Sequence, residues 1–131
     1  MVVDASALLA VLLREPERDA FIAALGAEGT RLVSAMSHLE TSLVLLSRKG
    51  RPALRELDLL VHDLEAQIVS VDRDQVLLAR DAFERYGKGR HPASLNLGDC
   101  CTYALCALTG EPLLFKGGDF ARTDLQLVRP A

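Results

Sequence analysis

Four acidic residues in this chain are candidates for chemistry that needs a metal ion. Asp4, Glu40, Asp99 and Asp119 each follow a short apolar run or lie near a predicted helix start. The histidines and cysteines show no spacing typical of a zinc site. If the fold gathers the four acids, their carboxylate oxygens would bind a hard cation such as Mg²⁺ or Mn²⁺. Such an ion neutralises a phosphate oxygen and activates water, so the set is typical of phosphodiester hydrolysis.

Each acid, taken alone, also has a structural explanation. An acid near a helix start accepts hydrogen bonds from free backbone N–H groups and interacts favourably with the helix dipole. Asp4 and Asp99 fit this role, and the spacing from Asn96 to Asp99 is that of a capping box. Asp119 lies in the turn KGGD, where an acid is common.

Glu40 has two alternative positions in its predicted helix. Ser37 and Glu40 have the spacing of a capping box, which would place both at the helix start. Ser34, at the end of a predicted strand, could equally be the cap. In that case Glu40 would lie on the second turn and face the interior.

Short apolar runs alternate with amphipathic segments and predict an α/β fold. We expect strands at residues 1–3, 31–34, 68–71 and 112–115, with an edge strand at 125–128. Helices are expected at 6–15, 17–26, 36–49, 53–66, 72–86 and 97–109. This order predicts helices on both faces of a mainly parallel sheet of four to five strands. Functional groups gather at the carboxyl ends of the strands in such sheets, so the four acids should meet at one edge.

Length and composition predict one domain, residues 1–131, with 50% hydrophobic content and a core of its own. The formal net charge of -3 excludes nucleic-acid binding by overall charge alone. Local basic residues would have to contact a phosphate backbone. Lys88, Arg90, Lys116 and Arg122 flank two of the acids and are the candidates.

The cysteines and the start of the chain predict a cellular compartment. Cys100, Cys101 and Cys106 lie on one apolar helical pattern, which favours reduced, buried thiols over a disulfide framework. The apolar start lacks the basic region of a signal peptide and is shorter than the roughly 20 apolar residues that span a bilayer. We therefore expect a soluble, cytoplasmic protein with no membrane contact.

The acids lie in motifs that resemble a known family. MVVDASALLAVLLREPE, HLETSLVL, KGRHPASLNLGDCCTYALC and EPLLFKGGDFARTD together resemble the PIN-domain family, and within it the VapC-like ribonuclease toxins. The resemblance covers essentially the whole chain and implies a PIN-like α/β/α sandwich. It also implies that Asp4, Glu40, Asp99 and Asp119 bind Mg²⁺ or Mn²⁺ and act as the catalytic groups.

The same resemblance implies polar helpers and partners. Ser6 and Asn96 would assist the acids. The protein would form a homodimer, cleave single-stranded RNA and be neutralised by a VapB-like antitoxin. In one departure, Gly118 stands where many relatives carry Asn or Asp, so a fifth polar group beside Asp119 is missing.

Two other functions remain open on the residues alone. A phosphatase-like hydrolase would use Asp4 as its nucleophile, but it usually carries a second acid where this chain has Ser6. A non-catalytic binding module would use the acids to dock a basic partner. Dependence of activity on metal and the absence of a phosphoenzyme would distinguish the three.

Overall fold

The β-branched run at the start of the chain lies in the middle of a parallel sheet in the computed structural model, which describes residues 1–130. β1 (Val2–Val3) pairs with β2 (Leu32–Ser34) on one side and with β4 (Leu113–Leu114) on the other. β3 (Gln67–Val69) pairs with the far side of β2. The order β3-β2-β1-β4, with every pair parallel, confirms the expected sheet.

The edge strand expected at residues 125–128 does not form. This segment makes a single parallel bridge, between Leu113 and Leu127, and the sheet of the described chain has four strands. Two backbone hydrogen bonds flank the bridge, from Leu113 N–H to Gln126 O and from Val128 N–H to Leu113 O. The pairing ends there because Pro130 has no N–H group with which to extend a ladder.

Both faces of the sheet are covered, because successive residues of β1 point to opposite sides. Val2 packs into one apolar cluster, with residues such as Leu105 of the sixth helix. Val3 packs into a second cluster, with residues such as Leu8 of the first helix. Both valines are almost fully buried. This two-sided burial explains why a run of only a few apolar residues specifies the central strand.

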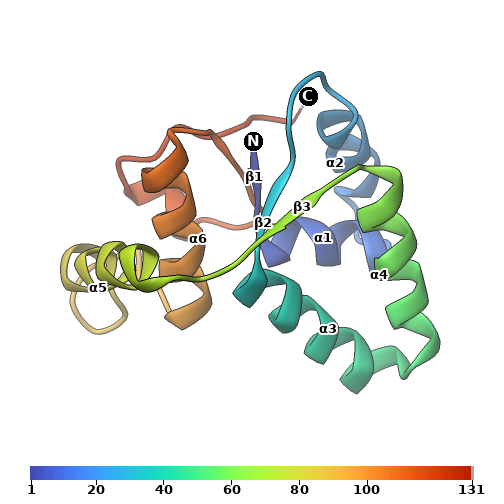
Figure 1. The fold of residues 1–131 in the computed structure, drawn as a ribbon, viewed down its shortest axis with the longest axis horizontal. Helices are drawn as coiled ribbons and strands as arrows, with labels where there is room; N and C mark the ends of the chain where they lie inside the picture. The colour runs from blue at the N-terminus through green and yellow to red at the C-terminus, as the bar shows by residue number, and fades with distance from the viewer. Residues whose placement is uncertain (131) are drawn as a thin grey trace.

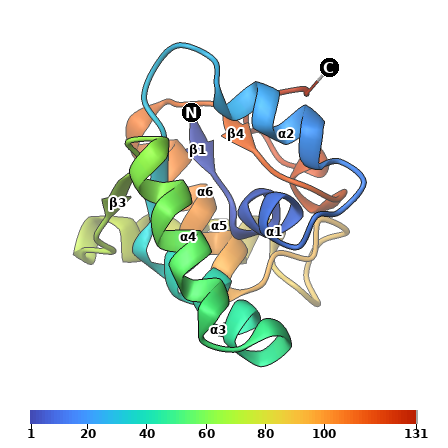
Figure 2. The same cartoon turned by 90° about the vertical axis from the view of Figure 1, so that its right-hand side faces the viewer.

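Helices form the two outer layers. They are α1 (Ala5–Leu12), α2 (Arg18–Leu25), α3 (Ala35–Lys49), α4 (Pro52–Asp63), α5 (Arg73–Tyr86) and α6 (Leu97–Thr109), and a short 3-10 helix, η1 (Asp119–Arg122), follows β4. Figure 1 shows α5 and α6 on one side of the sheet and α1, α2 and α4 on the other. Turned by 90°, α1 and α4 lie in front of the sheet and α5 and α6 behind it (Figure 2). The arrangement is the expected α/β/α sandwich.

Helix boundaries differ from expectation by a few residues. The largest differences are at the ends of α1 and α4, which stop three residues early, at Leu12 and Asp63, although the apolar pattern of α1 continues towards Pro16. Arg14 adopts a left-handed backbone conformation, with φ of 55°, and this turns the chain away before the proline. None of the helices in the described residues has both the length and the apolarity needed to cross a membrane.

Candidate active site

Asp4 follows β1 directly and caps α1. Its Oδ2 accepts hydrogen bonds from the backbone N–H of Ser6, at 3.0 Å, and from Ser6 Oγ, at 2.6 Å. Ser6 Oγ in turn accepts the backbone N–H of Lys116 at 2.9 Å, which ties the end of β4 to the start of α1. Asp4 is therefore a helix cap, as one interpretation predicted. It is also only 6% exposed, and a buried carboxylate needs more partners than a surface cap does.

A further partner of Asp4 comes from α6. Thr102 Oγ1 donates to Asp4 Oδ1 at 2.8 Å, and Ser37 Oγ of α3 lies 3.1 Å from the same threonine oxygen. Sequence reasoning missed both hydroxyls. A signal existed for Thr102, which is a polar residue in an apolar run, one helical turn after Asp99 and hence on the same face.

Glu40 lies on the second turn of α3 and not at its start. Ser34 is the N-cap, accepting the N–H of Met36 at 3.2 Å, so the alternative capping box with Ser37 is wrong. The Glu40 carboxylate reaches the start of α6, where a Cβ at Gly98 would overlap Glu40 Oε1. Burial, and then the charge of Asp4, raise the pKa of Glu40 above its ordinary value.

Asp99 forms the predicted capping box and also belongs to the acidic group. Asn96 Oδ1 accepts the N–H of Asp99 at 2.9 Å, and Asp99 Oδ2 accepts the N–H of Asn96 at 3.0 Å. Burial, and to a smaller extent the charges of Asp4, Asp119 and Glu40, raise the pKa of Asp99 to about 6, against the lowering effect of the hydrogen bond from Asn96. The other three acids therefore all lie near enough to Asp99 for their charges to act on it.

Asp119 is the most open of the four. It begins η1 and is exposed, and its charge acts on Asp99. Next to it, a Cβ at Gly118 would have nothing within 4 Å, and the φ of Gly118 is -105°. The missing polar side chain therefore leaves open space beside Asp119, in a backbone conformation that any residue adopts.

The donor set fits a hard divalent cation. It consists of carboxylate and hydroxyl oxygens, and the pKa values of Glu40 and Asp99 are raised first by burial and then by the negative charges of neighbouring acids, which a bound cation would offset. Within residues 1–130, no group of three or more His, Cys, Asp or Glu side chains is arranged to hold an ion directly. Mg²⁺ usually binds proteins through one or two carboxylates and keeps several water ligands.

The predicted basic residues divide into two groups. Lys116 Nζ lies 2.7 Å from Glu15 Oε2 and 3.1 Å from Glu17 Oε2, so two carboxylates already accompany its charge. Lys88, Arg90 and Arg122 are exposed and able to meet a phosphate backbone.

Two hollows lie on the surface of the protein, and one of them is apolar. One, which we call the α5–α6 groove, has a volume of about 570 Å³ and is lined by residues that include Val76, Phe83, Leu97, Cys100 and Cys101. The two cysteines and Cys106 are buried and free, and burial raises the pKa of Cys100 to about 11, which keeps the thiol protonated. This confirms the expectation that the cysteines lie in the core, outside a disulfide framework.

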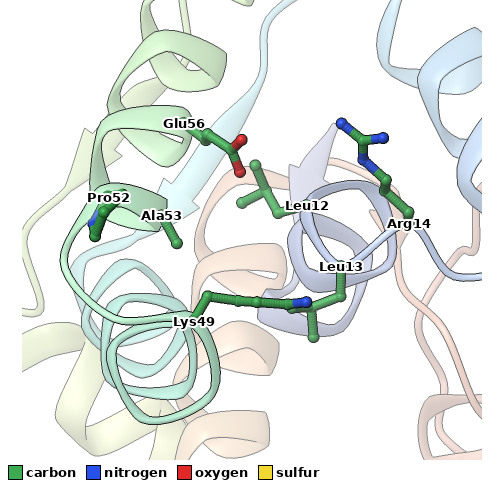
Figure 3. A pocket seen from close by; sticks show the side chains of 7 residues that line it. All are labelled: Leu12, Leu13, Arg14, Lys49, Pro52, Ala53 and Glu56. Carbon is green, nitrogen blue, oxygen red and sulfur yellow. The ribbon is translucent and has the colours of Figure 1, made fainter.

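The other hollow, the α1–α4 pocket, has a volume of about 250 Å³. Figure 3 shows its lining from the end of α1 and from the turn between α3 and α4, namely Leu12, Leu13, Arg14, Lys49, Pro52, Ala53 and Glu56. The pocket is thus lined by apolar side chains together with charged groups of both signs.

Comparison of the sequence with known proteins identifies the family of this chain. The family model described as PIN domain matches residues 1–125. Ribonuclease VapC30 of Mycobacterium tuberculosis is 51% identical over 128 residues, which are 98% of each chain. Ribonuclease VapC of Mycolicibacterium smegmatis is 49% identical, over 98% of this chain and 99% of that protein.

Two solved structures share the fold. The crystal structure of Mycobacterium tuberculosis VapC20, a Sarcin-Ricin loop cleaving toxin, matches with a TM-score of 0.81 at 19% identity and covers 98% of both chains. A toxin-antitoxin complex from Klebsiella pneumoniae matches with a TM-score of 0.72 at 18% identity, over 99% of this chain and 97% of that one. At such identities the likeness concerns the fold alone.

The fold and the gathered acids define an α/β/α sandwich with an acidic site at the carboxyl edge of its sheet. The chain belongs to the PIN-domain family, and within it to the group formed by its VapC ribonuclease relatives.

Proposed function

We propose that this chain is a VapC-like ribonuclease toxin that cleaves single-stranded RNA with the help of Mg²⁺ or Mn²⁺. The observation that carries the proposal is that Asp4, Glu40 and Asp119 lie near enough to Asp99 for their charges, after the larger effect of burial, to raise its pKa to about 6. Carboxylates gathered in this way repel one another, and a bound cation or a cationic partner would offset that repulsion. The relatives are named ribonucleases of the VapC group, which indicates that the reaction assisted by the cation is RNA cleavage.

The residues that would hold the ion are Asp4, Glu40, Asp99 and Asp119. A bound divalent ion supplies charge neutralisation at a phosphate oxygen and an activated water. Ser6 orients Asp4 through its hydrogen bonds to Oδ2. The other three acids are held by the helices that carry them, Glu40 by α3, Asp99 by α6 and Asp119 by η1.

Asn96 has the same kind of role for Asp99. Its backbone N–H holds Asp99 Oδ2, and this leaves Oδ1 of Asp99 to face an ion. Ser6 and Asn96, the two polar helpers proposed from the sequence, hydrogen-bond to two different acids. This pairing supports their proposed role, since each restrains an acid that repulsion would otherwise push outward.

The proposed RNA contacts are Lys88, Arg90, Arg122 and Lys116. The first three are exposed and able to approach phosphates directly. Lys116 would contribute only after separation from Glu15 and Glu17, so we rank it below the others. We treat residues 1–131 as one PIN domain, and we place its action in the cytoplasm, where the free thiols would stay reduced.

A VapB-like antitoxin is the proposed inhibitor. The α1–α4 pocket offers the side chains of Leu12 and Leu13 to a short helix or strand, and α1 leads from that pocket to Asp4. From Leu12 back to Ala5 the helix rises about 10 Å, a distance that three or four extended residues span. A basic side chain at the end of such a segment would pair with the acids, exclude the ion and block RNA together.

A homodimer is proposed on the basis of exposed apolar side chains. Val76, Phe83 and Leu97 line the α5–α6 groove and are 45%, 38% and 71% exposed. Apolar area of this kind, beside polar surroundings, marks protein interfaces. Pairing of two copies through it would place two acidic sites near one another, because Asn96 also lines the groove.

The two alternative functions are less well supported. Asp4 is only 6% exposed and has protein donors on both carboxylate oxygens, which hinders attack on a phosphate by that group. A binding module would use its acids at the surface, whereas only Asp119 of the four is exposed.

The experiment is cleavage of a single-stranded RNA pool by the purified chain, with and without Mn²⁺. We expect cleavage that stops in excess EDTA and that Asp99→Asn removes. Asp72→Asn is the matched control, because Asp72 also caps a helix, α5, through the N–H of Gln75 at 3.0 Å. Full activity in EDTA, or equal loss in both variants, would contradict the proposal.

A further inference from the structure

Two buried hydroxyl groups from different helices form a chain of hydrogen bonds that ends at Asp4. Thr102 in α6 and Ser37 in α3 are 0% and 1% exposed. Thr102 Oγ1 lies 2.8 Å from Asp4 Oδ1, and Ser37 Oγ lies 3.1 Å from Thr102 Oγ1. The fold therefore brings three polar groups that are far apart in the sequence into one buried chain.

The direction of both hydrogen bonds follows from the chemistry of the groups. An ionised carboxylate only accepts, so Thr102 donates its single hydroxyl proton to Asp4 Oδ1. Because its only hydroxyl proton is donated to Asp4, the Thr102 oxygen can only accept a hydrogen bond from Ser37. Ser37 therefore donates to Thr102, and both protons of the chain point towards Asp4.

The donors leave one free direction on the Asp4 carboxylate. A carboxylate has about four lone-pair sites on its two oxygens. Ser6 supplies two donors to Oδ2, through its N–H and its hydroxyl. Thr102 is the one donor found at Oδ1 within residues 1–130. The remaining site is thus on Oδ1, and the orientation of that oxygen depends on Thr102.

Thr102 differs from the other helical threonines with known partners. Thr41 donates to Ser37 O and Thr109 donates to Leu105 O, each at 2.7 Å, which is the ordinary bond from a helical threonine to its own preceding turn. Thr102 instead turns its hydroxyl out of its own helix towards Asp4. Packing alone does not require this, because a valine of the same shape would fill the space.

We propose that Thr102, supported by Ser37, is a positioning residue that fixes Asp4 Oδ1 for metal binding. The inference rests on the function proposed above. Ser37 lies one turn before Glu40, and Thr102 lies one turn after Asp99. The hydroxyl chain therefore also couples α3 and α6, the helices that carry two further acids, to the position of Asp4.

The experiment measures Mn²⁺ binding by titration calorimetry, separately from RNA cleavage. Thr102→Val removes the hydroxyl and keeps the shape, and we expect Mn²⁺ affinity to fall about 10- to 100-fold, as for other residues that orient a metal ligand. Thr102→Ser should restore affinity to within about threefold of the parent, since a hydroxyl is again present. Ser37→Ala should cost less, roughly fivefold, because it removes a bond between neutral groups.

Thr41→Val is the matched control. Thr41 is also 0% exposed and loses a buried hydroxyl bond, but one made to a backbone carbonyl. Its Mn²⁺ affinity should stay within about twofold of the parent, whatever its melting temperature. Unchanged affinity in Thr102→Val, or equal losses in Thr41→Val and Thr102→Val, would overturn the inference. A parent chain that binds no Mn²⁺ and cleaves no RNA would instead refute the proposed function.

Discussion

Replacement of Asp99 by asparagine should stabilise the metal-free protein above pH 6 while it abolishes cleavage. Burial and the charges of Asp4, Asp119 and Glu40 raise the pKa of Asp99 from 3.8 to about 6, despite the hydrogen bond from Asn96. At 1.36 kcal/mol per unit, a rise of about two units makes the ionised side chain cost about 3 kcal/mol of folding free energy. Asparagine retains the cap without the charge, and solvent screening at this partly exposed side chain reduces the gain, so we expect about 1–2 kcal/mol.

The gain should depend on pH in a definite direction. Between pH 4 and pH 6 the folded protein holds a proton on Asp99 that the unfolded chain has released, because the folded pKa is the higher one. The stability of the parent protein therefore falls as pH rises through this range. Below about pH 4 the side chain is neutral in both states and the penalty is absent. The stabilisation by asparagine should be full above pH 6 and should vanish near pH 4.

The assay is urea unfolding of the parent and variant proteins in EDTA at several pH values from 4 to 8. Asp72→Asn serves as the control, since Asp72 is an exposed cap outside the acidic group. It should change the free energy of unfolding by less than about 0.5 kcal/mol at every pH.

In the presence of Mn²⁺ the parent protein should be more stable than the Asp99→Asn variant. At a concentration 100 times its dissociation constant, the ion adds about 2.7 kcal/mol to the parent protein. The Asp99→Asn variant should gain much less because it lacks one proposed ligand. An Asp99→Asn protein that is less stable than the parent at pH 8 in EDTA, with no change of the difference between pH 4 and pH 6, would refute the reasoning.

Three further predictions concern particular contacts. Gly98→Ala should lower cleavage at least about tenfold with no loss of stability, because its Cβ would displace Glu40 Oε1 while alanine favours the helix by up to about 1 kcal/mol. Gly110→Ala, at a φ of 74° at the other end of α6, should instead lower the melting temperature and leave cleavage unchanged. Gly118→Asn should raise Mn²⁺ affinity in calorimetry and leave the melting temperature almost unchanged, because nothing lies within 4 Å of the new Cβ; unchanged affinity would argue against a role for that missing group. Phe83→Glu should shift the protein from dimer to monomer in sedimentation measurements, because it places a charge in the α5–α6 groove; Leu59→Glu, a change at an exposed leucine of α4, should not, and a dimer that survives Phe83→Glu would place the interface elsewhere.

The sequence by itself determined the elements and their order. Local chemistry is sufficient for this, because apolar periodicity and caps act within a few residues. Asp4 and the Asn96 to Asp99 capping box show the point, since their local hydrogen bonds are those that their spacing predicts. The alternation of strands and helices also predicted that the acids would lie at one edge of a parallel sheet.

Local patterns were insufficient where a choice depended on packing between elements. Ser34 and Ser37 were equally good caps for α3 by spacing, and the end of β2 decided in favour of Ser34. The segment at residues 125–128 had a strand pattern but formed only one bridge, because its neighbour β4 is short and Pro130 follows.

Only the tertiary structure decided the partners of the acids. Thr102 meets Asp4 across 98 residues of sequence, and Glu40 meets Gly98 because α3 and α6 start at the same edge. Lys116 was expected to contact RNA, but it forms ion pairs with Glu15 and Glu17. Both glutamates lie in the segment that follows α1. The physical reason is that periodicity shows which face of a helix is buried, whereas contacts between helices depend on how those faces pack against one sheet.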